Sequence, residues 1–171
     1  MNQQNLSVNF LVGMEIINKN KNIFSILTII IFVFLCFFFI KNNSSKNPEI
    51  GQIQSVKIAG KILKVELALT VKQQEQGLSG RNNLGEDEGM LFVFNYIDKY
   101  SFWMKDMKFP LDIIWLSEDL HVVYIKENAT PESYPESFSP NVDSKYVLEV
   151  NALFSQKNNL KVGDEVHFLS P

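Results

Sequence analysis

Two acidic residues stand within runs of apolar residues that have the composition of buried strands. Asp112 lies in the run 110–116 (PLDIIWL), and Glu149 lies in the run 146–150 (YVLEV). A buried carboxylate needs a hydrogen-bonding or charged partner, because otherwise its pKa rises and it takes up a proton. As a pair, Asp112 and Glu149 have the residue types of a hydrolase acid and base. Asp112 alone is equally well explained as a structural residue, either in an ion pair or capping backbone N–H groups after Pro110.

A second group of candidates precedes the first of these runs. In an extended strand over 100–107, Trp103 and Lys105 share one face, and Phe102 and Met104 share the other. We expect Phe102 and Met104 to pack in the core. A Trp beside a Lys forms a platform for a ligand, unless the Lys stem simply covers the ring.

Arg81 and Lys105 are the basic residues that we expect to lie closest to Asp112. An opposite charge would keep a buried carboxylate ionised. We therefore predict a ligand-binding groove lined by four residues: Arg81, Trp103, Lys105 and Asp112.

Other chemistry has little support in the sequence. His121 and His167 are too few and too far apart for a metal site, and 86–88 (EDE) has no alternating oxygen ligands of a calcium loop. Patterns such as GxSxG, a P-loop, HExxH, GxGxxG and CxxC do not occur in residues 47–171. We expect no metal and no cofactor, and a non-enzymatic role with an enzyme as the alternative.

The charge is distributed unevenly along the chain. Residues 1–46 carry four Lys and one Glu, whereas residues 47–171 carry twelve basic and eighteen acidic residues, a net charge of −6. An acidic domain with a single Arg repels a phosphate backbone, so we expect no nucleic acid as partner.

The run 23–40 contains eighteen residues without a charge and includes Cys36, the only cysteine. As a helix it would span about 27 Å, which is enough for the core of a bilayer. The sequence predicts an N-terminal tail (1–22), a transmembrane anchor or signal segment (23–40), a polar linker (41–51) and a domain (52–171).

The fate of the apolar run has two alternatives. A small-x-small cleavage site is poor here, so we favour an uncleaved anchor that holds the domain outside the cytoplasm; secretion after signal cleavage is the alternative. Lysines flank the run on both sides, and the positive-inside rule gives almost no bias. Met14 is also a sensible start.

The domain has the pattern of a strand-rich fold. Residues 52–58 and 61–69 alternate apolar and polar around Ala59-Gly60, which indicates a hairpin. Thr70 with Gln73 fits a capping box, so we expect a short helix that ends at Gly77 or Gly80.

The rest of the domain continues this pattern. Prolines exclude a regular element from 131–140, and 154–160 can form one or two helical turns. Further strands are expected at 89–94, 100–107, 111–116, 121–126, 146–150 and 165–169, and those at 111–116 and 121–126 should form a second hairpin that turns through 117–120. Short strands with so little helix favour a mainly β fold, a single compact barrel-like or sandwich-like domain.

Five segments in order resemble a known family. They are LALTVKQQEQGLSGRNNL (67–84), GMLFVF (89–94), FWMKDMKFPLDIIWL (102–116), YVLEVNA (146–152) and LKVGDEVHF (160–168). Over about residues 52–169 the chain is similar to the domain-of-unknown-function 192 family. This resemblance implies a compact, mostly β domain, often behind an export signal or anchor, and it brings no biochemical activity. The chain departs from the usual pattern at Ser79 (Met), Met107 (Thr) and Leu153 (Gly).

Together these features predict a binding or accessory module. A membrane-anchored β domain would present its groove to an envelope protein or to a small ligand outside the cytoplasm. The alternative is a hydrolase that acts on an envelope component through Asp112 and Glu149.

Overall fold

The computed structural model describes residues 29–35 and 49–171. The chain divides into two units, 1–46 and 47–171. In the first unit, residues 29–35 are helical with exposed side chains; the rest of the predicted segment 23–40 lies outside the described residues, as does most of the predicted linker. Within the described part, no helix is long and apolar enough to cross a membrane.

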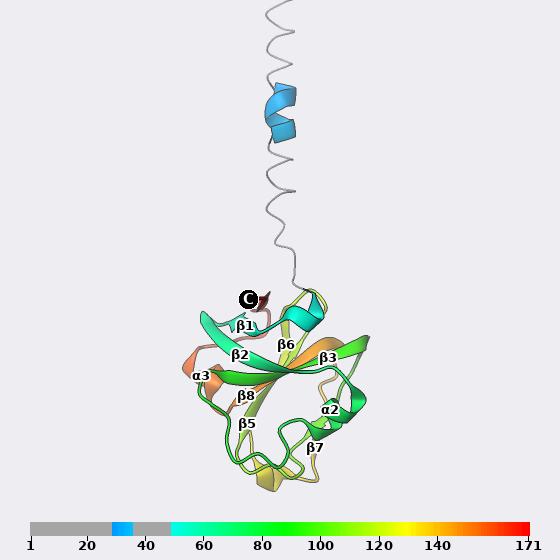
Figure 1. Ribbon diagram of the computed structural model, residues 1–171, viewed down its shortest axis with the longest axis vertical. Coiled ribbons are helices and arrows are strands. Elements are labelled where there is room, and N and C mark those ends of the chain that lie inside the picture. The colour runs from blue at the N-terminus through cyan, green and yellow to red at the C-terminus, as the bar shows by residue number, and fades with distance from the viewer. Residues whose placement is uncertain (1–28, 36–48) are drawn as a thin grey trace, which may run out of the picture. The chain divides into compact units, whose positions relative to one another are not determined.

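The second unit is mainly β, as predicted, and is built on one curled seven-stranded sheet in the order β6-β5-β8-β3-β2-β1-β9 (Figure 1). Its strands are β1 (Ser55–Ile58), β2 (Lys61–Ala68), β3 (Glu88–Asp98), β5 (Leu111–Leu116), β6 (Val122–Ala129), β8 (Ser144–Asn151) and β9 (His167–Leu169). A separate ribbon pairs β4 (Phe102–Trp103) with β7 (Ser137–Phe138). The helices are short: η1 (Ile50–Gln52), α2 (Val71–Gln76), η2 (Pro131–Ser133) and α3 (Phe154–Lys157).

The sheet curls into a half-barrel because its two edges approach each other beside β6 and β9. An isolated bridge joins His121 to Glu165, and the Val166 N–H donates to the Leu120 carbonyl at 2.8 Å. The concave side encloses one apolar core, to which every strand of this sheet contributes. The fold is therefore a single curled sheet, and the sandwich of two packed sheets that the sequence left open does not form.

A second core lies on the convex side of the sheet. Met90, Phe92, Ile113 and Trp115 project there and are covered by Leu78, which follows α2, and by residues of the β4–β7 ribbon. Strand β5 is buried along its whole length because it has a core on each face. This explains why PLDIIWL is apolar without alternation.

Both predicted hairpins are present. Ala59 and Gly60 have φ of 48° and 75°, as a two-residue turn between twisted strands requires. The hairpin of β5 and β6 turns through 117–120, and the Ser117 N–H donates to the His121 carbonyl at 2.9 Å.

Helix α2 connects two strands that run parallel, β2 and β3, a pairing that the sequence patterns do not predict. Parallel neighbours need a crossover, and α2 with the segment after it provides one. The predicted capping box is formed: the Thr70 side chain accepts from the Gln73 N–H, and the Gln73 side chain accepts from the Thr70 N–H. Gly77 ends the helix with φ of 48°.

Substituting Thr70 with Ala should lower the free energy of unfolding by about 1 kcal/mol, because the backbone N–H of Gln73 loses its acceptor. Thr70→Ser keeps a hydroxyl in place and should stay close to wild type. Urea unfolding of the full chain, followed by tryptophan fluorescence, measures both. Equal stability of the Ala and Ser variants would show that this cap does not stabilise the domain.

The strand predicted over 100–107 is much shorter than expected. Only Phe102 and Trp103 are extended, because Asp106 has a φ of 56° and the Met107 N–H donates to the Met104 carbonyl, which turns the chain. Met104 is buried and Phe102 packs against the convex core, as predicted. Residues 131–140, expected to be irregular, contain η2 and β7.

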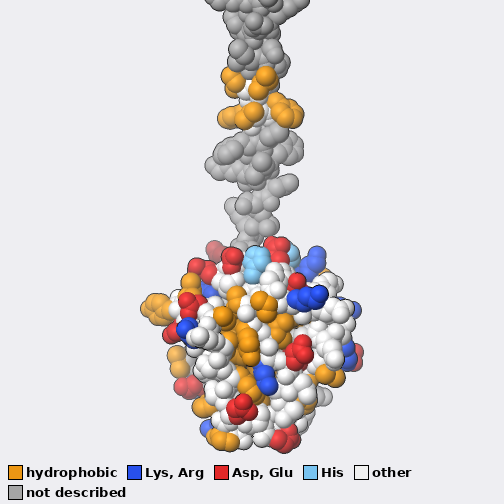
Figure 2. All heavy atoms as spheres, turned by 180° about the vertical axis from the view of Figure 1, so that it is seen from behind, with side chains coloured by type: hydrophobic (Ala, Val, Ile, Leu, Met, Phe, Trp, Pro, Cys, Tyr) orange, Lys and Arg blue, Asp and Glu red, His pale blue; other side chains and the backbone are white. Residues whose placement is uncertain are grey.

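The surface carries charges of both signs. On the face seen in Figure 2, Lys and Arg lie among Asp and Glu and do not form a continuous basic area. This agrees with the net charge of −6 counted over residues 47–171.

Candidate functional site

Asp112 is fully buried on β5, and its carboxylate accepts from three backbone N–H groups. Oδ1 accepts from Asn128 at 2.8 Å and from Leu153 at 3.1 Å, and Oδ2 accepts from Ser155 at 2.8 Å. Asn128 and Leu153 have φ of 46° and 68°, a conformation that ordinary side chains rarely adopt. Asp112 thus ties the end of β6 and the start of α3 to β5, by capping backbone N–H groups.

Glu149 lies on the neighbouring strand β8 but points the other way. In the register of β5 and β8, Glu149 is opposite Ile113, and Asp112 is opposite Val150. Residues opposite each other share a face, and successive residues alternate, so Asp112 is on the concave face and Glu149 on the convex face. The two carboxylates therefore do not form the acid and base pair that the sequence suggested.

The carboxyl group of Glu149 is buried without a hydrogen-bond partner. The side chain is 5% exposed, and Oε2 has no donor in the part of the chain that the structure describes. Its cross-strand neighbours, Met90 and Ile113, are apolar. Burial raises the pKa of Glu149 to about 8, partly offset by the positive charge of Arg81. At neutral pH the carboxyl group therefore holds its proton.

Glu149 lines a pocket of about 250 Å³ on the convex side of the sheet, bounded by α2, β3 and the chain around β4. Figure 1 shows α2 beside β3. The lining residues are Val71, Gln74, Glu75, Gln76, Gly77, Leu78, Ser79, Phe92, Phe94, Tyr100, Ser101, Phe102, Trp103, Met107 and Glu149.

Aromatic rings form most of one wall. Phe102 meets Phe92 and Phe94 edge to face, with ring centroids 4.9 and 6.5 Å apart. Tyr100 stacks on Phe94, and its backbone carbonyl accepts from the buried Trp115 indole at 2.8 Å. Such interlocked rings hold a preformed apolar surface.

Gly77 keeps the space above Glu149 open. A Cβ at this position would lie 3.3 Å from Cζ of Phe92 and 3.8 Å from Oε2 of Glu149. Since its φ of 48° also disfavours a side chain, this glycine both ends α2 and leaves room in the pocket.

The structure does not bring the four residues of the predicted groove together. Asp112 is on the opposite face, and Arg81 makes a two-pronged ion pair with Glu66. Lys105 is exposed and contributes its backbone carbonyl to Ser79 Oγ. Only Trp103, about half exposed and edge to face with Tyr134 at 6.4 Å, lines the pocket.

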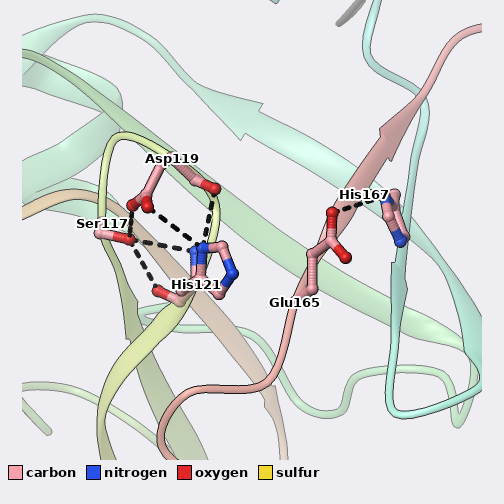
Figure 3. Close-up of polar contacts among 5 residues, drawn as sticks. All are labelled: Ser117, Asp119, His121, Glu165 and His167. Carbon is pink, nitrogen blue, oxygen red and sulfur yellow. Dashed lines mark hydrogen bonds and ion pairs between the residues drawn. The ribbon is translucent and has the colours of Figure 1, made fainter. Parts of the chain in front are cut away.

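The histidines lie elsewhere: His121 follows the turn at 117–120, and His167 is the first residue of β9 (Figure 3). Ser117 Oγ donates to Asp119, and the Nδ1 of His121 lies 3.3 Å from Oδ2 of Asp119, so the Ser hydroxyl does not meet the imidazole as in a catalytic triad. His167 lies 3.8 Å from Glu165. Among residues 29–35 and 49–171, no group of three or more His, Cys, Asp or Glu could hold a metal ion.

Sequence reasoning missed most of the pocket. Phe92 and Phe94 alternate on β3, and Tyr100 and Phe102 repeat the same spacing. This spacing of aromatic residues was the available signal, but an apolar strand predicts a core in the same way. The role of α2 as a wall depends on the parallel crossover.

These features describe a small β domain with a ligand-sized pocket around one buried carboxyl group. A family model described as "Uncharacterized ACR, COG1430" (DUF192) matches residues 54–168, more than half of the chain, and the chain belongs to this family. The family description gives no biochemical function. No curated protein matches this chain.

Two solved structures are similar to the chain. One, a "putative transcription regulator" from Sinorhizobium meliloti 1021, is 33% identical with a TM-score of 0.62, over 67% of this chain and 90% of that chain. The other, a protein of unknown function from Novosphingobium aromaticivorans DSM 12444, is 35% identical with a TM-score of 0.63, over 71% of this chain and 89% of that chain.

The three departures from the usual family pattern now have positions in the structure. Ser79 and Met107 both line the pocket, whereas Leu153 occupies a left-handed position beside Asp112, where Gly is common in the family.

Proposed function

We propose that this protein is a binding module for a small ligand, held at a membrane by residues 23–40 with its domain outside the cytoplasm. The observation that carries the proposal is a pocket with an aromatic wall that Glu149 also lines, where no described residue donates a hydrogen bond to the buried Oε2 of this carboxyl group. A buried acceptor without a donor costs free energy, and a ligand that supplies the donor recovers it. Apolar walls with few directed polar groups are typical of small-molecule sites.

A role in nucleic-acid binding has less support, although one similar structure carries the name of a transcription regulator. Residues 47–171 have a net charge of −6, and their single arginine is paired with Glu66. Non-specific contact with a phosphate backbone depends on clustered Lys and Arg.

A fragment screen tests the ligand-binding proposal. Small molecules with aromatic bodies and varied charge should raise the melting temperature of the full chain, because a ligand that binds only the folded state stabilises it, by about 2.7 kcal/mol at one hundred times its Kd. Trp103→Ala removes part of the wall from an exposed position and should weaken the shift.

Tyr96→Ala is the matched control, because Tyr96 is 80% exposed and outside the pocket lining. If the ligand still raises the melting temperature of Trp103→Ala but no longer raises that of Tyr96→Ala, the ligand binds outside this pocket. A complete lack of binding by a folded chain would reject the proposal.

The membrane placement is supported by the uncharged run 23–40 in the sequence. After cell fractionation, we expect the full chain in the membrane fraction, resistant to extraction at alkaline pH. Protease added outside the cytoplasmic membrane should remove the domain. A chain found only in the soluble fraction, with its leader cleaved, would favour secretion.

A further inference from the structure

The amide groups around Glu149 leave more acceptors than donors for a ligand. Gln74 donates from Nε2 to the backbone carbonyls of Ala68 at 3.3 Å and Val93 at 2.9 Å. A primary amide has two N–H groups, and Gln74 uses both, so only its carbonyl oxygen is available to bind a ligand. Gln76 also donates one of its side-chain N–H groups, to the Ser79 carbonyl at 2.9 Å.

The hydroxyl groups of the lining are used in the same way. Three of them donate to protein oxygens: Ser79 to the Lys105 carbonyl, Tyr100 to the Tyr96 carbonyl and Ser101 to Ser139 Oγ. A hydroxyl that has donated its hydrogen offers only its lone pairs to a ligand.

The ionisable side chains of the pocket lining also favour a cation over an anion. Glu75 and Glu149 contribute carboxyl groups, and the lining contains neither Lys nor Arg. The rings of Phe92, Phe94 and Phe102 add apolar surface for the body of a ligand. An anionic ligand would find acceptor oxygens where it needs hydrogen-bond donors. A cation with N–H groups would donate hydrogen bonds to these same oxygens.

We infer that the pocket takes an organic cation, a primary amine or guanidine on an apolar body, whose N–H group binds Oε2 of Glu149 while the body lies against the aromatic wall. This inference rests on the ligand-binding function proposed above and specifies the class of ligand. A pocket of about 250 Å³ suits a small free molecule.

Binding of such a cation requires Glu149 to be a carboxylate, so its proton must leave. The ionisable groups of α2, of the segment after it and of the segment before β4 are Glu75, Arg81 and Tyr100, and Arg81 is already paired with Glu66. The flanking strands place apolar Met90 and Ile113 directly opposite Glu149, and the same face also carries Glu88 on β3 and Glu66 on β2. Since the pKa of Glu149 is raised to about 8, complex formation at pH 7 should release close to one proton to the solvent.

Calorimetric titration of the full chain tests this inference with three probes of similar shape: benzylamine, benzyl alcohol and phenylacetate. Titrations at pH 7 in two buffers of different ionisation enthalpy measure the proton released. We expect benzylamine to bind at least about tenfold more tightly than benzyl alcohol, with release of nearly one proton, and phenylacetate to bind most weakly. The affinity for benzylamine should fall about tenfold per pH unit below the pKa of Glu149.

Glu149→Gln keeps the shape of the side chain and should abolish the proton release and the preference for the amine. Glu136→Gln, on the exposed loop before β7, is the matched control and should behave as wild type. If benzyl alcohol binds as tightly as benzylamine, or if Glu149→Gln leaves the preference intact, the inference is overturned and the ligand-binding function stands. If no probe or fragment of any charge binds, both are rejected.

Discussion

Replacement of Asp112 by Ala is expected to lower the free energy of unfolding by about 3–5 kcal/mol, the largest effect that we predict for a single side chain. The backbone N–H groups of Asn128, Leu153 and Ser155 would lose their shared acceptor in a buried place. Two of these residues have positive φ, so the loops that they form depend on the carboxylate. Urea unfolding monitored by the fluorescence of buried Trp115 measures the change.

Asp112→Asn tests the structural role of Asp112 even if the Ala variant fails to fold. It retains one acceptor oxygen and sets an NH₂ group against an N–H donor, so we expect a loss between those of Ala and wild type, about 1.5–3 kcal/mol. Asp143→Asn, at an exposed position, should change stability by less than about 0.5 kcal/mol. Wild-type stability of Asp112→Asn would contradict the structural role.

The second large effect concerns Glu149 and pH. Its pKa is about 8 in the folded domain, against an ordinary value of 4.5, which the unfolded chain should approach. Between these two pH values the folded state binds more protons than the unfolded state, so the contribution of Glu149 to stability is fully present below 4.5 and is lost as pH rises to about 8. The loss is about 1.4 kcal/mol per pH unit, and several kcal/mol over the whole window.

Glu149→Gln is neutral at every pH and should escape this loss. The difference in unfolding free energy, variant minus wild type, should rise from pH 5 to 8 and then level off. Stability measured in urea over this range gives the difference directly, and Glu136→Gln controls for the loss of a carboxylate as such. A flat difference for Glu149→Gln would mean that the carboxyl group is ionised in the folded domain and has a partner there.

Much of the local structure could be predicted because it depends on neighbouring residues. The turn at Ala59-Gly60 joins two strands that are adjacent in the chain and contains a glycine, which tolerates positive φ, and the capping box of Thr70 and Gln73 spans a single turn of helix. The strand over 100–107 was the main local error, because Asp106 adopts a left-handed conformation that its residue type allows but does not demand.

The candidate site could be predicted only in fragments. Trp103 and Glu149 were both singled out from the sequence, and both line the pocket. Their grouping with other residues was not recoverable, because the register of β5 and β8 decides which carboxylate faces which core. A shift of one residue in that register would exchange the two faces.

The sequence alone thus determined the mainly β class, the family, the hairpins, the capped helix and the acidic character of residues 47–171, since local residue types and composition set these features. The tertiary structure alone decided that Asp112 caps backbone N–H groups, that Glu149 lines a pocket where no described residue donates to its Oε2, and that α2 forms a wall of that pocket beside β3. These outcomes depend on strand order, on the parallel crossover and on which face of the sheet is covered. Contacts between residues far apart in the chain set all three.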